Sequence, residues 1–77
     1  MGNFASAEAE ARKAIASDAR LIAAWLNLGL AQAAQKNLDE ARRSFSHAQS
    51  LDPTDPRPGQ SLDDLDELSQ RSTESSP

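Results

Sequence analysis

Apolar residues recur at helical spacing along most of the chain, and the most regular stretch runs from Leu21 to Leu51. Its first half, between Arg20 and Lys36, is rich in leucine and alanine, and its apolar side chains cover about 200° of a helix at 100° per residue. That band is too wide for one packing surface. The pattern predicts a helix that packs against two neighbours.

A second helix is predicted after Asn37, because small and large apolar residues return at Ala41, Phe45 and Ala48 with i, i+4, i+7 spacing. Asn37 is a good N-cap residue, and Glu40 three residues later completes a capping-box pattern. The proline at position 53 disfavours helical backbone at the residue before it, so this helix should end near Leu51.

A glycine within the first of these helices needs a physical reason, since it costs about 1 kcal/mol relative to alanine. Close approach of the second helix supplies one: bulky Trp25 and Phe45 and small Gly29 and Ala41 are complementary parts of one helical hairpin. The sequence therefore predicts a hairpin core, which consists of Trp25, Leu28, Gly29, Ala41, Phe45, Ala48 and Pro53.

This spacing resembles the tetratricopeptide repeat (TPR) family, whose units of about 34 residues follow W-x2-L-G-x2-Y, then A-x3-F, then P. The length of one such unit is called the repeat period below. The resemblance covers residues 22–55, and it departs at Gln32, where the family usually carries tyrosine. It implies an all-α fold of antiparallel helical hairpins and a role in binding a peptide or helix of another protein.

The segment before this unit repeats its second helix one repeat period earlier: Ala7 precedes Ala41, and Ala14 precedes Ala48, at that offset. Ala11 replaces Phe45 and Ala19 replaces Pro53. We therefore expect a helix from about Phe4 to Ser17, as the second helix of a partial unit. About one and a half repeats result, fewer than the three that such arrays usually need, so the chain is either a fragment of a longer array or completes itself by association.

The remaining segments divide the chain further. We expect a partial unit over residues 1–19, a complete unit over 20–55, a proline-rich linker over 56–60, an acidic amphipathic capping helix over 61–70 and a disordered tail over 71–77. The capping helix would begin at Ser61, with Asp64 as its capping-box partner, and would dock weakly through Leu62, Leu65 and Leu68. Two docking places stay open: the Phe45 and Leu51 side of the hairpin, as a cap, or the groove of Leu26 and Leu30, as a competitor for the partner.

Composition limits the classes of function. The chain has 77 residues, no cysteine and a net charge of −4. Residues 1–54 are neutral, and all of the negative charge lies in residues 55–77, which argues against nucleic acid or an anionic membrane as a partner. No apolar run approaches the ~20 residues needed to span a bilayer, and the start shows no secretory signal, so a cytoplasmic location is the default.

No constellation of residues indicates catalysis. His47 is the only histidine and falls beside the apolar face, toward solvent, where no second histidine or cysteine could join it. The acidic run at Asp63, Asp64, Asp66 and Glu67 lacks the glycine and the alternating spacing of a calcium loop. We expect no enzyme activity, no cofactor and no metal.

A protein-binding surface is what remains. The TPR resemblance implies a concave groove lined by first helices, and on this helix the groove positions are Leu26, Asn27, Leu30 and Ala33. The two leucines favour an apolar contact over a carboxylate clamp. Three hypotheses stay open: a scaffold or adaptor that binds a partner protein, an accessory segment of a larger and possibly enzymatic protein, or a structural repeat that forms homo-oligomers.

Overall fold

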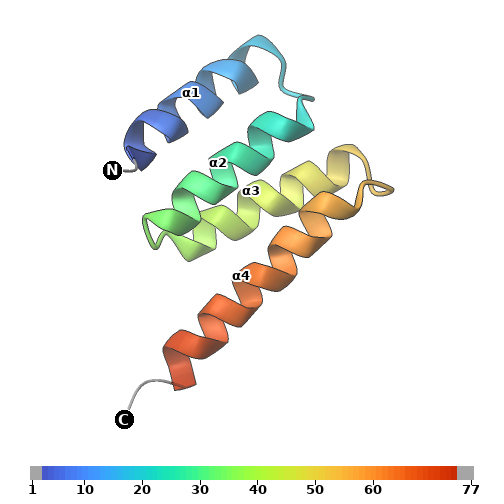
Figure 1. Cartoon of the computed structure of the whole chain (residues 1–77). Helices are drawn as coiled ribbons and strands as arrows, with labels where there is room; N and C mark the ends of the chain where they lie inside the picture. Colours follow the sequence, from blue (N-terminus) through green and yellow to red (C-terminus); the bar gives the residue numbers. More distant parts are fainter. Residues whose placement is uncertain (1–2, 75–77) are drawn as a thin grey trace.

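A computed structural model of the chain describes residues 3–74, and within that range it contains four α-helices (Figure 1). They are α1 (Phe4–Ser17), α2 (Ile22–Ala34), α3 (Leu38–Leu51) and α4 (Pro56–Glu74). Successive helices pack as antiparallel neighbours. The all-α class and the helical-hairpin architecture predicted from the sequence are confirmed.

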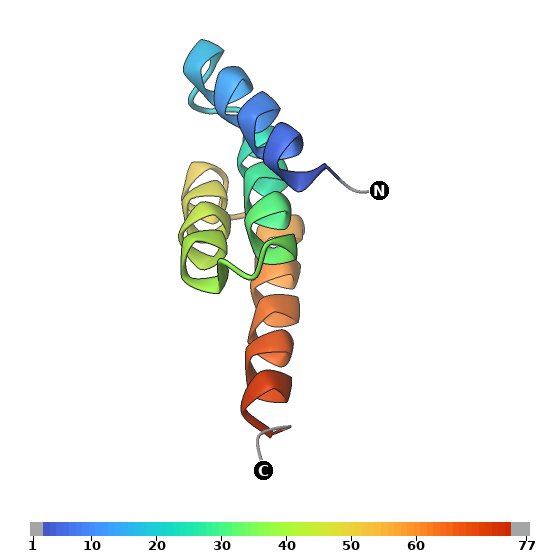
Figure 2. The same ribbon diagram turned by 90° about the vertical axis from the view of Figure 1, so that its left-hand side faces the viewer.

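α2 is the central helix, because it packs against α1 on one side and α3 on the other and also touches α4. α4 packs mainly on α3. Figure 2 shows α3 to one side of α2 and α4, with the C-terminal half of α4 extending beyond the other helices. The wide apolar band of α2 thus has the several neighbours that its width predicts.

The hydrophobic core lies where α2, α3 and α4 meet. It is a cluster of Leu26, Ala41, Phe45, Ala48 and Leu65. Two of these are alanines with no exposed surface, and Phe45 is 2% exposed. Small residues on α3 let α2 approach closely, and the phenyl ring fills the space between the helices.

The first helix has the bounds predicted for it, from Phe4 to Ser17. Asn3 caps its N-terminus: the side-chain oxygen accepts a hydrogen bond from the Ser6 backbone N–H at 3.1 Å. Asp18 ends it in extended conformation. α3 likewise ends at Leu51 before the extended Asp52, as the following proline predicts.

The connection between α2 and α3 differs from the predicted capping box. The Asn37 side chain makes no capping hydrogen bond. Instead Lys36 adopts a φ of 69°, the Lys36 N–H donates to Ala33 O at 3.0 Å, and the Asn37 N–H donates to Gln32 O at 2.9 Å. These two bonds form a Schellman motif, which satisfies carbonyls at the end of α2. The predicted capping box is wrong because the Asn37 N–H, which Glu40 would have to accept, donates to Gln32 O, and Glu40 accepts from Gln32 Nε2 instead.

The left-handed position of Lys36 leads to a stability prediction. A non-glycine residue in this conformation costs about 1–2 kcal/mol, and glycine usually occupies the place. Lys36→Gly should therefore raise the free energy of unfolding by up to about 1 kcal/mol, after the entropy lost by a more flexible unfolded chain is deducted. Urea denaturation followed by circular dichroism measures this. The matched control is Lys13→Gly in the middle of α1, which should destabilise the protein; a loss in both variants would contradict the prediction.

The C-terminal segment is a longer helix than predicted. α4 begins at Pro56 rather than Ser61, so the proposed linker over 56–60 is wrong, and so is the capping box of Ser61 and Asp64. Prolines at the first and third helical positions are compatible with a helix, because the first N–H groups have no intrahelical acceptor. Residues 71–74 also belong to α4, contrary to the predicted tail, while residues 75–77 lie outside the described part.

Candidate functional site

The core of the α2–α3 hairpin is organised around one close contact. Gly29 faces the Phe45 ring so closely that a methyl group at position 29 would overlap it. Leu28, Ala41 and Ala48 are buried nearby. Two of the predicted core residues are not buried: Trp25 is partly buried against the cluster, and Pro53 is exposed in the turn after α3. The role of the proline is to end the helix, not to fill the core.

Trp25 is partly buried and joins two parts of the molecule. Its Nε1 donates a hydrogen bond to the carbonyl of Ala19 at 2.8 Å, which fixes the turn between α1 and α2. Its ring lies against the His47 ring, with the centroids 4.0 Å apart and the planes tilted by 39°. His47 is exposed, as predicted, and this ring contact gives it a packing role that the sequence did not indicate.

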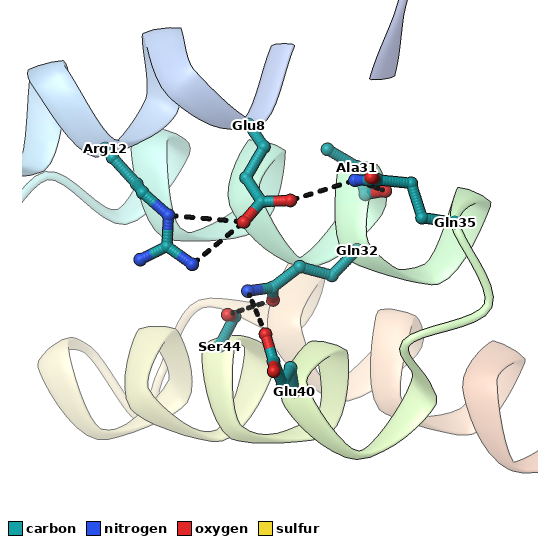
Figure 3. Close-up of polar contacts among 7 residues, drawn as sticks. All are labelled: Glu8, Arg12, Ala31, Gln32, Gln35, Glu40 and Ser44. Carbon is teal, nitrogen blue, oxygen red and sulfur yellow. Dashed lines mark hydrogen bonds and ion pairs between the residues drawn. The ribbon is translucent and has the colours of Figure 1, made fainter. Parts of the chain in front are cut away.

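A buried polar pair occupies the place where the sequence departs from the repeat pattern. Gln32 and Ser44 are both buried, and the Ser44 hydroxyl donates to Gln32 Oε1 at 2.6 Å (Figure 3). Gln32 Nε2 donates in turn to Glu40 Oε2 at 3.4 Å. A satisfied hydrogen bond between helices thus replaces the packing of a tyrosine.

A second polar link, at the surface, joins α1 to the end of α2. Glu8 accepts hydrogen bonds from Arg12 at 2.8 Å and from Gln35 Nε2 at 2.9 Å (Figure 3). Both bonds lower the pKa of Glu8 from its ordinary value, and the bond from Arg12 has the larger effect. The link holds α1 against α2 at the end opposite their connecting turn.

The start of α4 is fixed by an aspartate. The Asp55 carboxylate accepts a hydrogen bond from the Arg57 backbone N–H at 3.0 Å. It also forms an ion pair with the Arg57 guanidinium, at 2.7 Å. Both hydrogen bonds lower the pKa of Asp55, and the bond from the guanidinium has the larger effect. A carboxyl group whose pKa is lower in the folded state stabilises the fold above its ordinary pKa and loses that effect as the pH falls through the folded value. The anchor of α4 is thus weakened only in acid.

The predicted groove residues divide into covered and open ones. Leu26 is only 8% exposed and lies in the core, and Ala33 is partly buried against the same cluster, which includes Leu65 of α4. Leu26 is therefore not open to a partner, because α4 docks over it. Asn27 and Leu30 are exposed, and Leu30 is 57% exposed. The sequence could not separate these two pairs without the position of α4.

The open pair belongs to a cleft between α1 and α2 of about 500 Å³. The α1 wall is formed by Phe4, Ala7, Glu10, Ala11 and Ala14, and the α2 wall includes Leu21, Asn27 and Leu30. Phe4, Leu21 and Leu30 are three of the four large hydrophobic residues exposed in the described part of the chain. Three of these four side chains thus line this cleft, a common sign of an interaction site. Leu30 also borders two smaller clefts beside α4, one of which includes Leu68.

The acidic residues of the described range bear on metal binding, and its helices bear on membrane crossing. Over that range no group of three or more histidine, cysteine, aspartate or glutamate side chains is placed to hold a metal ion. The acidic face of α4 is instead exposed, and its Asp66 forms an ion pair with Arg42 of α3. No described helix combines the length and the apolar character that a bilayer crossing requires.

A comparison with protein-family models decides the identity of the central hairpin. Residues 22–55 match the tetratricopeptide repeat model. These residues form a tetratricopeptide repeat. The matched segment contains α2, α3 and the turn that leads into α4, and it has the bounds that the sequence pattern indicates. Searches of curated proteins and of solved structures found no match.

The helices on either side of the repeat, α1 and α4, also follow its period. Tetratricopeptide repeats generally mediate protein–protein interactions, and their concave surfaces arise from stacked units. α1 begins one repeat period before α3, and α4 begins one repeat period after α2. α1 therefore stands where the second helix of a preceding repeat would stand, and α4 where the first helix of a following repeat would stand.

Proposed function

We propose that this chain is a protein-interaction module that binds an apolar helix or peptide of a partner protein in the cleft between α1 and α2, without catalysis of its own. The observation that carries the proposal is the gathering of Phe4, Leu21 and Leu30 around that cleft. A tetratricopeptide repeat beside the cleft supports a binding role. Of the groove predicted from the sequence, Asn27 and Leu30 belong to this surface.

A pull-down with matched leucine variants tests the proposal. Leu30→Asp places a charge on the wall of the cleft, whereas Leu68→Asp changes a leucine of similar exposure, 49%, on α4 outside the cleft. Wild type and Leu68→Asp should retain the same partner from an extract, and Leu30→Asp should lose it. Equal retention by all three proteins would contradict binding in this cleft.

Self-association through the same surface is the second candidate, because the exposed apolar residues of the cleft could equally be covered by another copy of the chain. If so, isolated chains should form dimers or larger species at micromolar concentration, and Leu30→Asp should shift them to monomers. Sedimentation equilibrium measures this. A well-folded monomer at high concentration would eliminate self-association and leave binding of a different protein.

The third candidate is an accessory segment of a larger, possibly enzymatic, protein. In that case a helix from the larger protein would fill the cleft, and the surface used would be the same.

A further inference from the structure

The cleft between α1 and α2 has a covered counterpart one repeat period later in the same chain. α1 and α3 begin one repeat period apart, and α2 and α4 do so as well. In the later pair, α2 itself lies across the surface formed by α3 and α4. The covered surface therefore shows what kind of segment fits the open cleft.

The α1 wall of the cleft matches the surface of α3 beneath α2. Ala7 and Ala14 line the cleft, and the residues one repeat period later are Ala41 and Ala48, which are fully buried in the core with Leu26 of α2. Two alanines one helical heptad apart make a shallow surface that lets a helix approach closely. At these two positions α1 therefore carries the same small residues that α3 places beneath α2.

The α2 wall matches α4 in the same way. Asn27 and Leu30 line the open cleft, and their counterparts one repeat period later are Ser61 and Asp64. Those two residues line small clefts along the edge where α2 meets α4. The α1 wall of the open cleft therefore corresponds to a surface that a helix covers elsewhere in the molecule, and its α2 wall corresponds to the edge of α4 that borders α2.

We propose that the cleft accepts one amphipathic α-helix of a partner protein, seated as α2 is seated on α3 and α4, with a large apolar side chain where α2 has Gly29. This inference rests on the proposed function, because it concerns the same cleft. It adds the conformation of the bound segment and the residue types that the cleft selects.

The size requirement follows from Ala11. At the covered surface, Phe45 fills the space against α2 so completely that only glycine fits opposite its ring. Ala11 stands one repeat period before Phe45, lines the cleft and is itself only 5% exposed, so at this position a small, covered side chain replaces the ring that faces α2 in the later pair. A helix with glycine opposite Ala11 would leave a void there, whereas a leucine or phenylalanine would fill it.

A charge requirement follows from Glu10. Its counterpart Ser44 donates a hydrogen bond to Gln32 of α2 at 2.6 Å, but an ionised carboxylate can only accept. Glu10 lies 3.8 Å from Lys13, and both side chains are largely exposed, so this ion pair leaves the carboxylate accessible. The bound helix should carry lysine or arginine where α2 has Gln32. Aligned with α2, the bound helix should carry tryptophan or another large apolar residue at the position of Trp25 and leucine at the position of Leu28. A second large apolar residue should stand at the position of Gly29, and a cation at the position of Gln32.

Peptides that copy α2 test the size requirement against the full chain. Three fluorescein-labelled peptides of residues 20–36 are compared: the native sequence, Gly29→Ala and Gly29→Leu. The alanine peptide is the matched control, because alanine raises helix propensity at least as much as leucine. By fluorescence anisotropy, the leucine peptide should bind about tenfold or more tightly than the alanine peptide. The leucine peptide cannot displace α2 from its own seat, since the Phe45 ring blocks any side chain at position 29.

A protein variant with a large side chain at position 11 completes the test. In the Ala11→Phe variant the preference should invert, with the native glycine peptide binding more tightly than the leucine peptide. Circular dichroism checks that this variant folds. If it does not, the charge pair decides: wild type should prefer a Gln32→Lys peptide over a Gln32→Glu peptide, and the Glu10→Lys protein should show the opposite preference.

Three outcomes would overturn the inference, and they separate it from the proposed function. Equal affinity for the leucine and alanine peptides would remove the size requirement, as would a preference that Ala11→Phe leaves unchanged. Binding of no peptide at millimolar concentration would exclude the helical seat. In each case, a partner that the pull-down still loses with Leu30→Asp would leave the cleft as a binding site for a segment of another kind.

Discussion

Replacing Phe45 by alanine is expected to lower the free energy of unfolding by about 3–5 kcal/mol. The ring is 2% exposed, it belongs to the cluster shared by α2, α3 and α4, and it packs directly against Gly29. Truncation would open a cavity in the core between the helices. The loss is comparable with the whole stability of about 3–5 kcal/mol that a small core usually supplies. The variant should therefore be largely unfolded, with little helical circular dichroism at 25 °C.

The matched control is the other phenylalanine of the chain. Phe4 is 45% exposed at the rim of the cleft, so Phe4→Ala should cost less than about 1 kcal/mol. Denaturant titrations of the two variants, with wild type as reference, give the comparison. A loss below about 1 kcal/mol for Phe45→Ala would mean that Phe45 is not a core residue and that the interhelical contact with Gly29 is wrong.

The helices of the hairpin could be predicted because their signals are local and redundant. Gly29 and Phe45 support the same prediction: the glycine costs helix stability in α2, and the Phe45 ring of α3 packs in the space that the missing side chain leaves. Pro53 fixes the end of α3 through the backbone of the residue before it. The offset of one repeat period extended the same argument to α1. Each of these predictions combines a local rule with the period of the repeat.

The start of α4 was missed because a local rule was preferred to that period. The linker predicted over 56–60 treats its prolines as helix breakers, although Pro56 stands one repeat period after the first residue of α2. In the first turn a proline loses no hydrogen bond, and Pro58 is fully buried there. The repeat period together with Asp55 as an N-terminal cap would have indicated the observed start.

The binding surface could be predicted only in part, because it depends on where a distant helix docks. Leu26 and Leu30 are four residues apart on one helix face, and nothing in their spacing separates them. α4 covers the first and leaves the second exposed. The predicted groove did not include α1, although the sequence already leaves the face of that helix with Phe4, Ala7 and Ala14 without a partner; these residues form one wall of the cleft.

Truncation of Leu65 should have the second large effect, a loss of about 2–5 kcal/mol for Leu65→Ala. Leu65 is 1% exposed and is the residue through which α4 enters the core beside Leu26 and Phe45. The sequence left open whether this helix caps the hairpin or occupies the partner groove. Leu65 lies in one cluster with Phe45 and Leu26, so α4 covers the hairpin and also part of the predicted groove, while it does not line the cleft of α1 and α2. Its loss should therefore destabilise the fold and expose apolar surface that aggregates.

Leu68 on the same helix provides the control, because it is 49% exposed and Leu68→Ala should cost less than about 1 kcal/mol. Hydrogen exchange adds a local measurement: amides near Leu65 should be protected in wild type and in Leu68→Ala, and should lose protection in Leu65→Ala. Equal stability of the two variants would show that α4 does not dock. Tighter binding of the leucine peptide to Leu65→Ala than to wild type would show instead that α4 competes for the partner's place, and would reject its assignment as a cap.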